Sequence, residues 1–573
     1  MSDSDQSKGG RWSRRGFLEA VGRAGGAAAV YETMTAMGLL HIPEAFAAPP
    51  ELPADYGAGK RVVILGAGIA GLTAGYELMK AGYEVVLLEA KERAGGRSYT
   101  VRRGDTIEEI TGTKQVCKFD EGPQMYLNAG PGRLPYHHTA ILHYCNVLGV
   151  PLEVYNMMSR ANLFQSDTSW NAQPIVNRRI ANDTRGFISE LLAKAVTKGS
   201  LNDELKGVDK DGLLKLLSSF GDVEPKRDYK YEGSSRSGYV VDPSIEDCGQ
   251  VIAPLTLSDL VSSKFWDHRF YQPEEYEWQP TLFQPVGGMD QIWKGFLRTP
   301  VGGRIQYKRE VVRVDNITDG GVAKVKVTHR PSGSSGAGDA IIADWCISTI
   351  PLPILAKVGN NFKTDYAKAV ASVNFANTCK VGWQSNARFW ETKDQMYGGI
   401  SYTTDNITQM WYPSYDYFGR KGILTGAYNY DDDAELMASL GLRQRLELAM
   451  NGAKKLHPDF AQHVPLDLGL SIAWKNVPYQ LGGWADDWTC KNTEGESAYH
   501  RLLQPEGRFY VAGDQVSYIS GWQEGAVRSA HHVIEGITGR RAAATPMLKA
   551  PQAHARPATR QAPGTRRRTR GLP

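Results

Sequence analysis

The chain has 573 residues, of which 42% are hydrophobic, and this length favours two or more domains with buried cores. No stretch approaches the roughly 20 consecutive apolar residues that span a bilayer, so a transmembrane protein is not expected. The net charge of +4 comes from the last part of the chain, because residues 541–573 carry eight Lys or Arg and no acidic residue. The remaining body is mildly acidic, which does not favour a nucleic-acid-binding protein.

The cysteines are scattered along the chain, without a CxxC pair and without histidines at metal-ligand spacing. No metal site is therefore expected. The six positions are Cys117, Cys145, Cys248, Cys346, Cys379 and Cys490.

Residues 1–47 resemble a twin-arginine export signal. Arg14 and Arg15 precede a mildly apolar stretch of small residues, and the sequence AFAA offers a cleavage site after Ala47. Charged residues inside the apolar stretch leave a basic amphipathic helix as the alternative. We expect export by the twin-arginine route, so that the mature protein is periplasmic or secreted.

A nucleotide-binding motif follows. Residues 62–65 form a short β-branched run that predicts a strand, and residues 72–81 have helical spacing. The glycine-rich turn between them allows pyrophosphate to approach the backbone at the N-terminus of the helix. A second predicted strand, residues 85–88, ends at Glu89, which is placed to accept hydrogen bonds from a ribose. The positions of the turn expected to contact the dinucleotide are Gly66, Gly68, Ala70 and Gly71.

A second glycine-rich turn, ERAGGRS, contains Gly95 and Gly96, and Arg97 behind them is placed to reach the pyrophosphate. A surface turn with a solvated arginine is the alternative. With both turns in this arrangement, the sequence resembles the flavin amine oxidase family, which includes L-amino-acid, monoamine and polyamine oxidases. The resemblance implies FAD as cofactor and an α/β fold. An FAD-binding Rossmann-like domain of the GR2 type would carry an interleaved α+β substrate-binding domain and a helical insertion.

Further segments resemble the family in its own order along residues 57–540. FDEGPQ, residues 119–124, is similar to the segment that passes under the flavin, and PVGGMDQI, residues 285–292, to the family's returning segment. Val311 in REVVRVD resembles the position whose backbone contacts the adenine. ADWCISTIP, residues 343–351, is similar to the strand that closes this part of the FAD domain.

The last family motif is GRFYVAGDQVSYISGWQEGAVRSA. There Asp514 would meet the ribityl chain of the cofactor. The helix after Gly521 would point its N-terminus at the electron-rich N1–O2 edge of the flavin.

The resemblance also implies a division of the chain. The parts are an export signal (1–47), a first FAD-binding part (57–135), a helical substrate-funnel region (136–280), a second FAD-binding part (281–353), a substrate-binding domain (354–470), a third FAD-binding part (471–540) and a basic tail (541–573).

An α-amino acid brings a carboxylate that needs a matched cation, best a planar guanidinium. GPGRLP, residues 130–135, resembles the L-amino-acid oxidase segment whose arginine binds this group, which makes Arg133 the expected carboxylate ligand. An ordinary surface arginine is the alternative. In GILTGAYNYDDDAE, Tyr428 resembles the tyrosine that gives the carboxylate a further hydrogen bond, with Tyr430 as the alternative if the register shifts by two.

Lys380 stands ten residues before Trp390, as does the family lysine that holds a water against flavin N5. An exposed strand lysine is the alternative. Trp474 and Trp522 resemble residues in front of the flavin face, although core packing is the default for a tryptophan. Monoamine oxidases carry a flavin-linked cysteine after a GG pair where this chain has Trp484, so the FAD is expected to be noncovalent.

The implied reaction is the FAD-dependent oxidation of an L-amino acid by dioxygen to a 2-oxo acid, with ammonia and hydrogen peroxide as further products. A homodimer is expected. His137 and His138 are candidate bases or simple helix-surface residues. Asp486 and Asp487 could serve a basic substrate side chain or form a solvated loop.

An amine or polyamine oxidase is the main alternative function, and a non-catalytic FAD-bound protein is a second. A disulfide reductase is disfavoured because no redox CxxC is present.

Residues 541–573 are rich in Pro, Arg, Thr and Ala and lack hydrophobic periodicity. Burial cannot offset the entropy cost of ordering such a segment, so we expect a disordered tail. A weak interaction with anionic surfaces is the alternative to a merely solvated tail.

Overall fold

The computed structural model describes residues 49–486 and 497–540. Within these residues, no helix combines the length and the apolar character needed to cross a bilayer. The expected export signal and basic tail lie outside the described residues, as does Asp487.

A five-stranded parallel sheet carries the glycine-rich turns, and its strand order is β14-β2-β1-β18-β25. Its inner strands read as continuous hydrophobic runs because helices and loops cover both faces, as in other parallel sheets. The strands are β1 (Arg61–Leu65), β2 (Glu84–Leu88), β14 (Ile305–Gln306), β18 (Trp345–Ser348) and β25 (Phe509–Val511). The strands predicted at residues 62–65 and 85–88 are confirmed as β1 and β2, and the segment at residues 343–351 supplies β18 beside β1.

Two long helices pack against each other beside this sheet, α2 (Ile69–Lys80) and α15 (Gln523–Thr538). The predicted helix at residues 72–81 begins three residues earlier, at Ile69, because the backbone turns into the helix directly after Gly68. Helix α7 (Gln291–Leu297) also contacts α2. These helices and the sheet bury one continuous hydrophobic core.

A seven-stranded sheet forms the second part of the body, with the order β10-β9-β21-β22-β23-β20-β24. Its strands are β9 (Leu163–Gln165), β10 (Ile175–Val176), β20 (Thr378–Ser385), β21 (Ile400–Thr403), β22 (Gln409–Trp411), β23 (Gly422–Tyr430) and β24 (Gly469–Ala473). Strands β20 and β23 pair antiparallel and set Lys380 opposite Tyr428. The helices α11 (Asp431–Ser439) and α12 (Leu442–Leu456) contact these strands.

A four-stranded sheet, β17-β16-β15-β19, lies beyond the parallel sheet at the end of the molecule away from the seven-stranded sheet. Its strands are β15 (Arg309–Asp319), β16 (Val322–Pro331), β17 (Asp339–Ala343) and β19 (Gly359–Asn360). The small sheets are formed by β3 (Thr100–Val101) with β6 (Leu127–Asn128), β4 (Thr106–Glu108) with β5 (Lys114–Val116), and β7 (Leu134–Pro135) with β13 (Leu282–Pro285) and β8 (Leu152–Tyr155). The shorter helices are α8 (Leu352–Leu355), α9 (Thr364–Ala371), α10 (Phe389–Thr392), α13 (Phe460–His463) and α14 (Ala498–Leu503).

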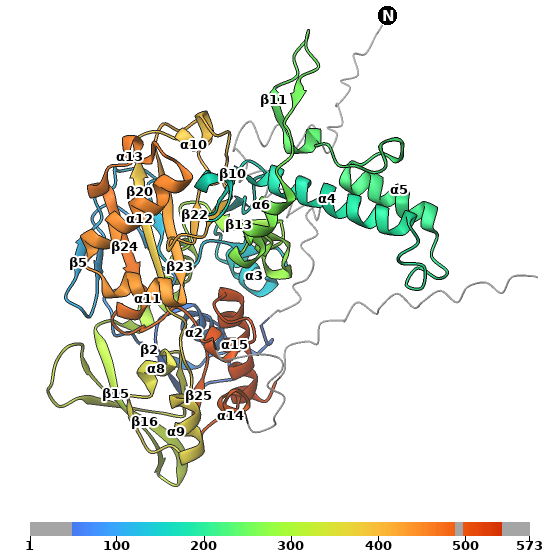
Figure 1. Ribbon diagram of the computed structural model, residues 1–573. Helices are drawn as coiled ribbons and strands as arrows, with labels where there is room; N and C mark the ends of the chain where they lie inside the picture. The colour runs from blue at the N-terminus through green and yellow to red at the C-terminus, as the bar shows by residue number, and fades with distance from the viewer. Residues whose placement is uncertain (1–48, 487–496, 541–573) are drawn as a thin grey trace, which may run out of the picture.

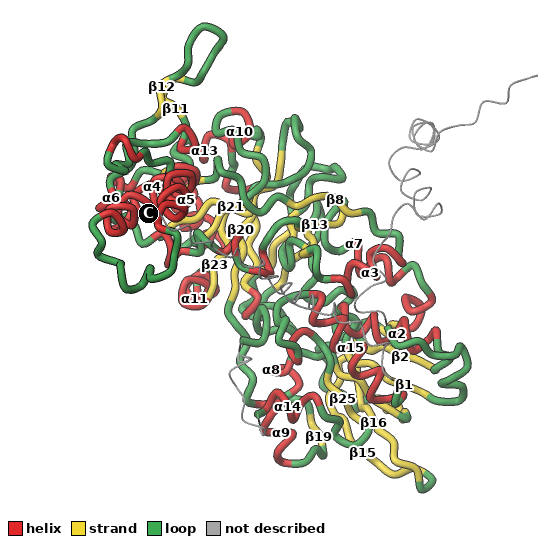
Figure 2. Tube along the Cα trace, turned by 90° about the vertical axis from the view of Figure 1, so that its right-hand side faces the viewer, coloured by secondary structure: helices red, strands yellow, loops and turns green. Residues whose placement is uncertain are grey.

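Residues 136–280 hold α3 (Thr139–Val147), α4 (Asn177–Thr197), α5 (Lys210–Gly221) and α6 (Leu257–Ser262). Helices α4 and α5 pack against each other and project from the body (Figure 1). This region is not wholly helical, because β9 and β10 extend the seven-stranded sheet and β8 pairs with β13. It also forms a hairpin of β11 (Tyr239–Val241) and β12 (Gln250–Val251). Figure 2 shows α4, α5, α6 and the β11–β12 hairpin at the opposite end from the parallel sheet, with the seven-stranded sheet between them. Helix α3, by contrast, contacts α7 and α15.

Candidate active site

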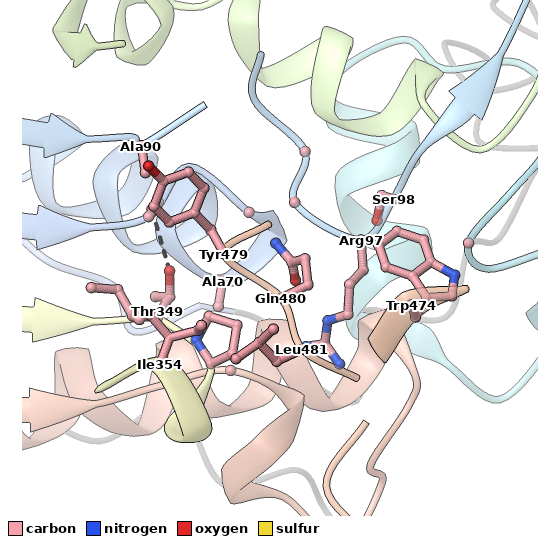
Figure 3. Close-up of a pocket in the computed structure, with 18 of the residues that line it drawn as sticks. Ala70, Ala90, Arg97, Ser98, Thr349, Ile354, Trp474, Tyr479, Gln480 and Leu481 are labelled. Atoms are coloured by element: carbon pink, nitrogen blue, oxygen red, sulfur yellow. Dashed lines mark hydrogen bonds between the residues drawn. The ribbon is translucent and has the colours of Figure 1, made fainter. Parts of the chain in front are cut away.

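A cavity of about 800 Å³ is lined by residues from both large sheets and from the loops between them. This volume is within the range of cofactor and ligand sites, roughly 300–1,000 Å³. Figure 3 shows part of its wall, from Ala90 and Tyr479 at one end to Ser98 and Trp474 at the other. The cavity therefore joins the dinucleotide motif to the predicted substrate residues.

The glycine-rich turn leaves space for a ligand and at the same time packs tightly behind it. A Cβ atom added at Gly68 would meet nothing within 4 Å, so the backbone there is open to the cavity. A Cβ atom at Gly71 would lie 2.1 Å from the carbonyl oxygen of Gly66, which itself has φ of 101°. Gly66, Gly68 and Ala70 line the cavity, whereas Gly71 is outside the lining and permits the close packing of helix and strand.

Glu89 follows β2 and is 8% exposed. Its carboxylate accepts hydrogen bonds of 2.9 Å from the amides of Ala67 and Lys91, which fix it at the cavity wall. Val311, on β15, lines the same cavity. The structure thus brings both predicted residues to the wall of the same cavity.

Arg97 and Asp514 form an ion pair that lines the cavity. The guanidinium also donates to the carbonyl of Gly483, and the carboxylate accepts a 3.0 Å hydrogen bond from the amide of Gly521. Gly96 lines the wall beside them, and Gly521 has φ of 80°, where the chain turns into α15. A pyrophosphate or ribityl group could exchange these hydrogen bonds for its own without the residues leaving the wall.

Lys380 lies at the other end of the cavity and is only 1% exposed, so it is not an exposed strand lysine. Its Nζ donates to the carbonyl of Asn128 at 3.1 Å and to that of Gly130. The same atom is 4.5 Å from the ring centroid of Tyr428 and 4.6 Å from that of Trp411. Burial, and to a smaller extent the charge of Arg133, lower the pKa of Lys380 well below its usual range.

Tyr428 lines the cavity. Tyr430 is outside the lining, and its ring is tilted against those of Tyr428 and Trp484, at centroid distances of 4.6 and 5.8 Å, respectively. Burial raises the pKa of the Tyr428 phenol, so this side chain is a hydrogen-bond donor at neutral pH. The geometry therefore favours Tyr428 over its alternative two residues later.

Arg133 is 5% exposed and lies just outside the cavity lining. Its guanidinium carbon is 4.4 Å from the ring centroid of Trp278 and 4.7 Å from that of Trp411. Tyr155 and Trp522 complete an aromatic cage, each at 5.9 Å. Among the described residues no carboxylate forms an ion pair with Arg133, and its Nε has no hydrogen-bond partner. A buried guanidinium without a counterion is costly unless a ligand neutralises it.

Trp474 and Trp522 both line the cavity. The indole of Trp474 donates a 3.0 Å hydrogen bond to the carbonyl of Ala129 and is 3% exposed. Trp522 connects the cavity to the aromatic cage, since its ring lies 4.9 Å from that of Trp278. The two indoles therefore form part of the cavity wall near Lys380, and Trp522 also contacts Arg133.

His138 is buried, with 1% exposure, and is not a helix-surface residue. Its Nε2 lies 2.6 Å from the carboxylate of Glu277, and the Nε2 of His137 lies 3.1 Å from the same oxygen. These three side chains form the described group whose ligand atoms lie close enough to hold a metal, within 4.8 Å of one another. Hydrogen bonds from both imidazoles account for the arrangement, and they fix the segment that carries Trp278.

Several residues of the site were not predicted from the sequence. Trp278 and Trp411, which surround Arg133, stand in segments without family motifs. Tyr479 and Gln480 also line the cavity, and they follow Trp474 closely in the sequence. The segment at residues 119–124 is absent from the cavity lining, where residues 129–131 take part instead.

The glycine-rich turn with Glu89 places the chain among proteins that bind a dinucleotide cofactor, and the cavity extends from this turn to the aromatic side chains around Lys380. The model of the family described as flavin containing amine oxidoreductase matches residues 69–535. The chain belongs to this family, and the expected fold class is confirmed.

Similar proteins include the flavin-dependent L-tryptophan oxidase of Lentzea aerocolonigenes. It is 25% identical over 83% of this chain and 98% of its own length. The L-amino-acid oxidase of Protobothrops flavoviridis is 24% identical over 82% of this chain and 87% of its own. Among solved structures, cyclohexylamine oxidase from Brevibacterium oxydans has a TM-score of 0.54 at 14% identity, covering 84% of this chain and 99% of its own. Putrescine oxidase bound to putrescine has a TM-score of 0.53 at 16% identity, with the same coverage.

The residues present fit the flavin of this family. The open backbone at Gly68 and the amide-held carboxylate of Glu89 suit the pyrophosphate and the ribose, respectively. The beginning of α15 would face the electron-rich edge of the ring system with its helix dipole. The chamber beyond that edge is the place where a substrate would meet the ring.

Proposed function

We propose that the protein is an FAD-dependent L-amino-acid oxidase, which converts L-amino acids to 2-oxo acids and releases ammonia and hydrogen peroxide. The observation that carries this proposal is Arg133, a buried cation beside the chamber with no carboxylate partner among the described residues. An α-carboxylate supplies the missing counterion, and a simple amine does not. The proteins similar in sequence over most of this chain support the same substrate class.

When bound, the flavin supplies the two-electron oxidation of the substrate and the passage of both electrons to dioxygen. Arg133 binds the α-carboxylate with parallel hydrogen bonds, and Tyr428 donates a further one. These hydrogen bonds from two sides fix the position of the substrate's Cα–H bond, which is broken in the oxidation. Trp474 and Trp522 restrict the entry of bulk water to the chamber.

Lys380 completes the site from its place opposite Tyr428. Burial lowers the pKa of Lys380 and so favours the neutral amine, a group that can both donate and accept a hydrogen bond. We propose that it holds a water molecule against the reacting end of the cofactor. The imino acid that leaves the chamber is hydrolysed by water to the 2-oxo acid and ammonia.

The FAD is proposed to be noncovalent. None of the five described cysteines lines the cavity, and Trp484 stands after the glycine pair at the wall. Acid precipitation should release all of the flavin into the supernatant as free FAD. Flavin that stays with the precipitated polypeptide would contradict this.

The test of the function is a peroxide-release assay with the holoenzyme on panels of L-amino acids, D-amino acids, monoamines and polyamines. We expect turnover of L-amino acids only. Turnover of amines without turnover of amino acids would support the amine-oxidase alternative, in which Arg133 has another role. A flavin that no member of the panels reduces would support a non-catalytic protein.

A further inference from the structure

A short turn of the insertion contacts the guanidinium of Arg133. This turn is the 3-10 helix η6 (Tyr276–Trp278). Its last residue places an indole whose ring centroid lies 4.4 Å from the guanidinium carbon, nearer than the other three rings of the aromatic cage. The same indole lies 4.9 Å from the ring of Trp522, which lines the cavity. The place of Trp278 therefore determines part of the surroundings of the proposed carboxylate ligand.

The polar contacts that hold η6 to other segments come from Glu277. The amide of Trp278 donates to a carbonyl three residues earlier, which is a contact within the same stretch of chain. Across to another segment, the carboxylate oxygen Oε2 of Glu277 lies 2.6 Å from Nε2 of His138 and 3.1 Å from Nε2 of His137. Among the described residues, no other side-chain hydrogen bond joins η6 to a distant segment. Glu277 is therefore the polar anchor of the turn.

The histidines on the other side of this contact are fixed to the body of the protein. His138 is 1% exposed, and its ring lies 4.9 Å from that of Trp522. It directly precedes α3, and the amides of Ala140 and Ile141 at the start of that helix donate to the carboxylate of Glu524 at 3.2 and 2.9 Å. Glu524 is buried in the first turn of α15. The anchor therefore connects η6 to two helices that contact each other.

The hydrogen-bonding state of the two imidazoles follows from their other ring nitrogens. Nδ1 of His137 and Nδ1 of His138 are buried without a hydrogen-bond partner. Neutral rings that donate through Nε2 leave only an acceptor there, whereas a proton on Nδ1 would be a buried donor without an acceptor. Both rings therefore donate to Glu277. The hydrogen bond from His138 contributes most to lowering the pKa of that carboxyl, which keeps it ionised at neutral pH.

A metal ion fits this group less well than the hydrogen bonds do. An ion bound at the two Nε2 atoms would place a proton on each Nδ1, without the partner that usually orients a metal-bound imidazole. The group therefore acts as a hydrogen-bonded cluster.

Apolar packing alone would not fix the ring of Trp278. The indole is half-buried and packs against a hydrophobic cluster that includes Tyr155 and Trp411, but burial of apolar surface has no preferred direction. The hydrogen bonds of Glu277 do have one. We propose that Glu277 is a positioning residue, which holds Trp278 against Arg133 and thereby strengthens the binding of the substrate's α-carboxylate. This assignment rests on the proposed function, in which Arg133 binds that carboxylate.

The expected effect follows from how an indole acts on a guanidinium. A cation held against a tryptophan ring is stabilised enough to change an equilibrium about two- to thirtyfold. The ring also holds the guanidinium in place before the ligand arrives, which lowers the ordering cost of binding, and it keeps water from the ion pair. An uncharged ligand gains little from this arrangement. The effect of Glu277 should therefore be confined to ligands that carry a carboxylate.

The test measures ligand binding to the oxidised holoenzyme by the change in flavin absorbance. 3-Phenylpropanoate carries the carboxylate of an amino acid without the amine that would be oxidised, and 3-phenylpropanamide is its uncharged counterpart. We expect the unmodified enzyme to bind the acid more tightly than the amide. Glu277→Ala should weaken binding of the acid about two- to thirtyfold and leave binding of the amide unchanged.

Two further variants separate positioning from structural support. Glu277→Gln should keep much of the acid binding, because both imidazoles donate to one oxygen of Glu277 and an amide carbonyl can accept both bonds. Glu274→Ala is the matched control. Glu274 is an exposed carboxylate of the same segment, and its side chain makes no hydrogen bond or ion pair with another described residue. Its removal should change neither affinity.

A double-mutant cycle tests whether Glu277 acts through Trp278. Trp278→Leu removes the indole, so it should weaken binding of the acid by itself. Because the ring is then absent, Glu277→Ala should add little in the Trp278→Leu background. Losses that add in full would mean that Glu277 acts by another route, and they would overturn the assignment.

The assignment is also wrong if Glu277→Ala binds the acid as tightly as the unmodified enzyme does, or if it loses affinity for acid and amide alike. In both cases the peroxide-release assay still shows turnover of L-amino acids, and the proposed function stands. If the unmodified enzyme binds the acid no better than the amide, Arg133 gives no selectivity for a carboxylate, and the positioning role falls with it. Turnover of amines without turnover of L-amino acids would instead refute the function and this assignment together.

Discussion

Arg133 is the residue on which the proposed substrate class depends, because it is buried, surrounded by aromatic rings and without a carboxylate partner among the described residues. Arg133→Ala removes one partner of a buried charge pair in the substrate complex. Such a loss costs on the order of 2–5 kcal/mol, or roughly thirtyfold to several-thousandfold in kcat/KM. The loss should be similar for every L-amino acid, because all share the α-carboxylate.

Steady-state peroxide release measures this effect, with the corresponding amines as control substrates. The amines lack the carboxylate, so the substitution should leave their background rate of peroxide release unchanged. Arg133→Lys should rescue only part of the loss, because lysine has charge without two-pronged geometry. Near-wild-type kcat/KM for the best L-amino acid in Arg133→Ala would mean that another group binds the carboxylate.

A second prediction at the level of single residues concerns Lys380. Lys380→Met keeps a long side chain on β20 and removes the amine that donates to the carbonyls of Asn128 and Gly130. We expect reoxidation of the flavin by dioxygen to slow far more than its anaerobic reduction by substrate. Stopped-flow absorbance measures the two half-reactions separately, and equal slowing of both would indicate that Lys380 is a structural residue.

At the scale of elements, a buried ion pair ties the β4–β5 hairpin to α12 and to the segment that carries Trp474. Arg445 donates to both oxygens of Glu109, at 2.6 and 2.8 Å, and the two side chains are 1% and 0% exposed. Glu109 also accepts from Asn476, two residues after Trp474. The pair therefore supports one wall of the chamber from behind.

Arg445→Ala should lower the free energy of unfolding by about 3–5 kcal/mol, because it leaves an uncompensated buried carboxylate. The double variant Arg445→Met with Glu109→Leu removes both charges and should recover much of this loss. Denaturant unfolding of the holoenzyme measures both changes. If the single and double variants were equally destabilised, packing rather than charge would explain the effect.

The elements of the dinucleotide motif could be predicted because their signals are local. The strand, the turn at Gly66 to Gly71 and the acid at Glu89 lie within one short stretch, and each has a physical reason to be there. The aromatic cage could not be predicted in this way. Trp278 and Trp411 reach Arg133 from an insertion and from a separate sheet, and nothing in their neighbouring residues indicates that meeting.

The insertion was harder to predict for the same reason. His138 follows a Gly/Pro loop, and its burial depends on Glu277, far along the chain, which no local pattern links to it. The strands β9 and β10 are short and owe their conformation to pairing within the seven-stranded sheet, not to their own propensity.

At the scale of the whole molecule, a buried histidine makes stability depend on pH. His531 on α15 is 6% exposed, and its Nε2 lies 2.8 Å from the hydroxyl of Tyr144 on α3. Burial, with smaller effects of His143, Arg528 and Lys80, lowers its pKa to about 3. The folded protein therefore binds fewer protons at this site than the unfolded chain between that value and the ordinary histidine pKa of about 6.5.

By linkage, stability falls as pH decreases from about 6.5 towards 3, and the contribution of His531 amounts to a few kcal/mol over this range. His531→Leu removes the titration and should flatten the dependence. Denaturant midpoints at neutral pH and near pH 4 measure it. An unchanged difference between the two midpoints in His531→Leu would show that other groups cause the acid sensitivity.

The parallel sheet consists of strands that are far apart in the chain: β1 and β2 stand near its start, β14 and β18 in its middle, and β25 close to its described end. On a ribosome, the first glycine-rich turn emerges hundreds of residues before the strand and helix that complete its cavity. Such non-local pairing is slow and exposes unpaired edges until the last strand arrives. The dinucleotide site is therefore complete only after β25 and α15 have been synthesised, so the cofactor is expected to bind after these elements have formed.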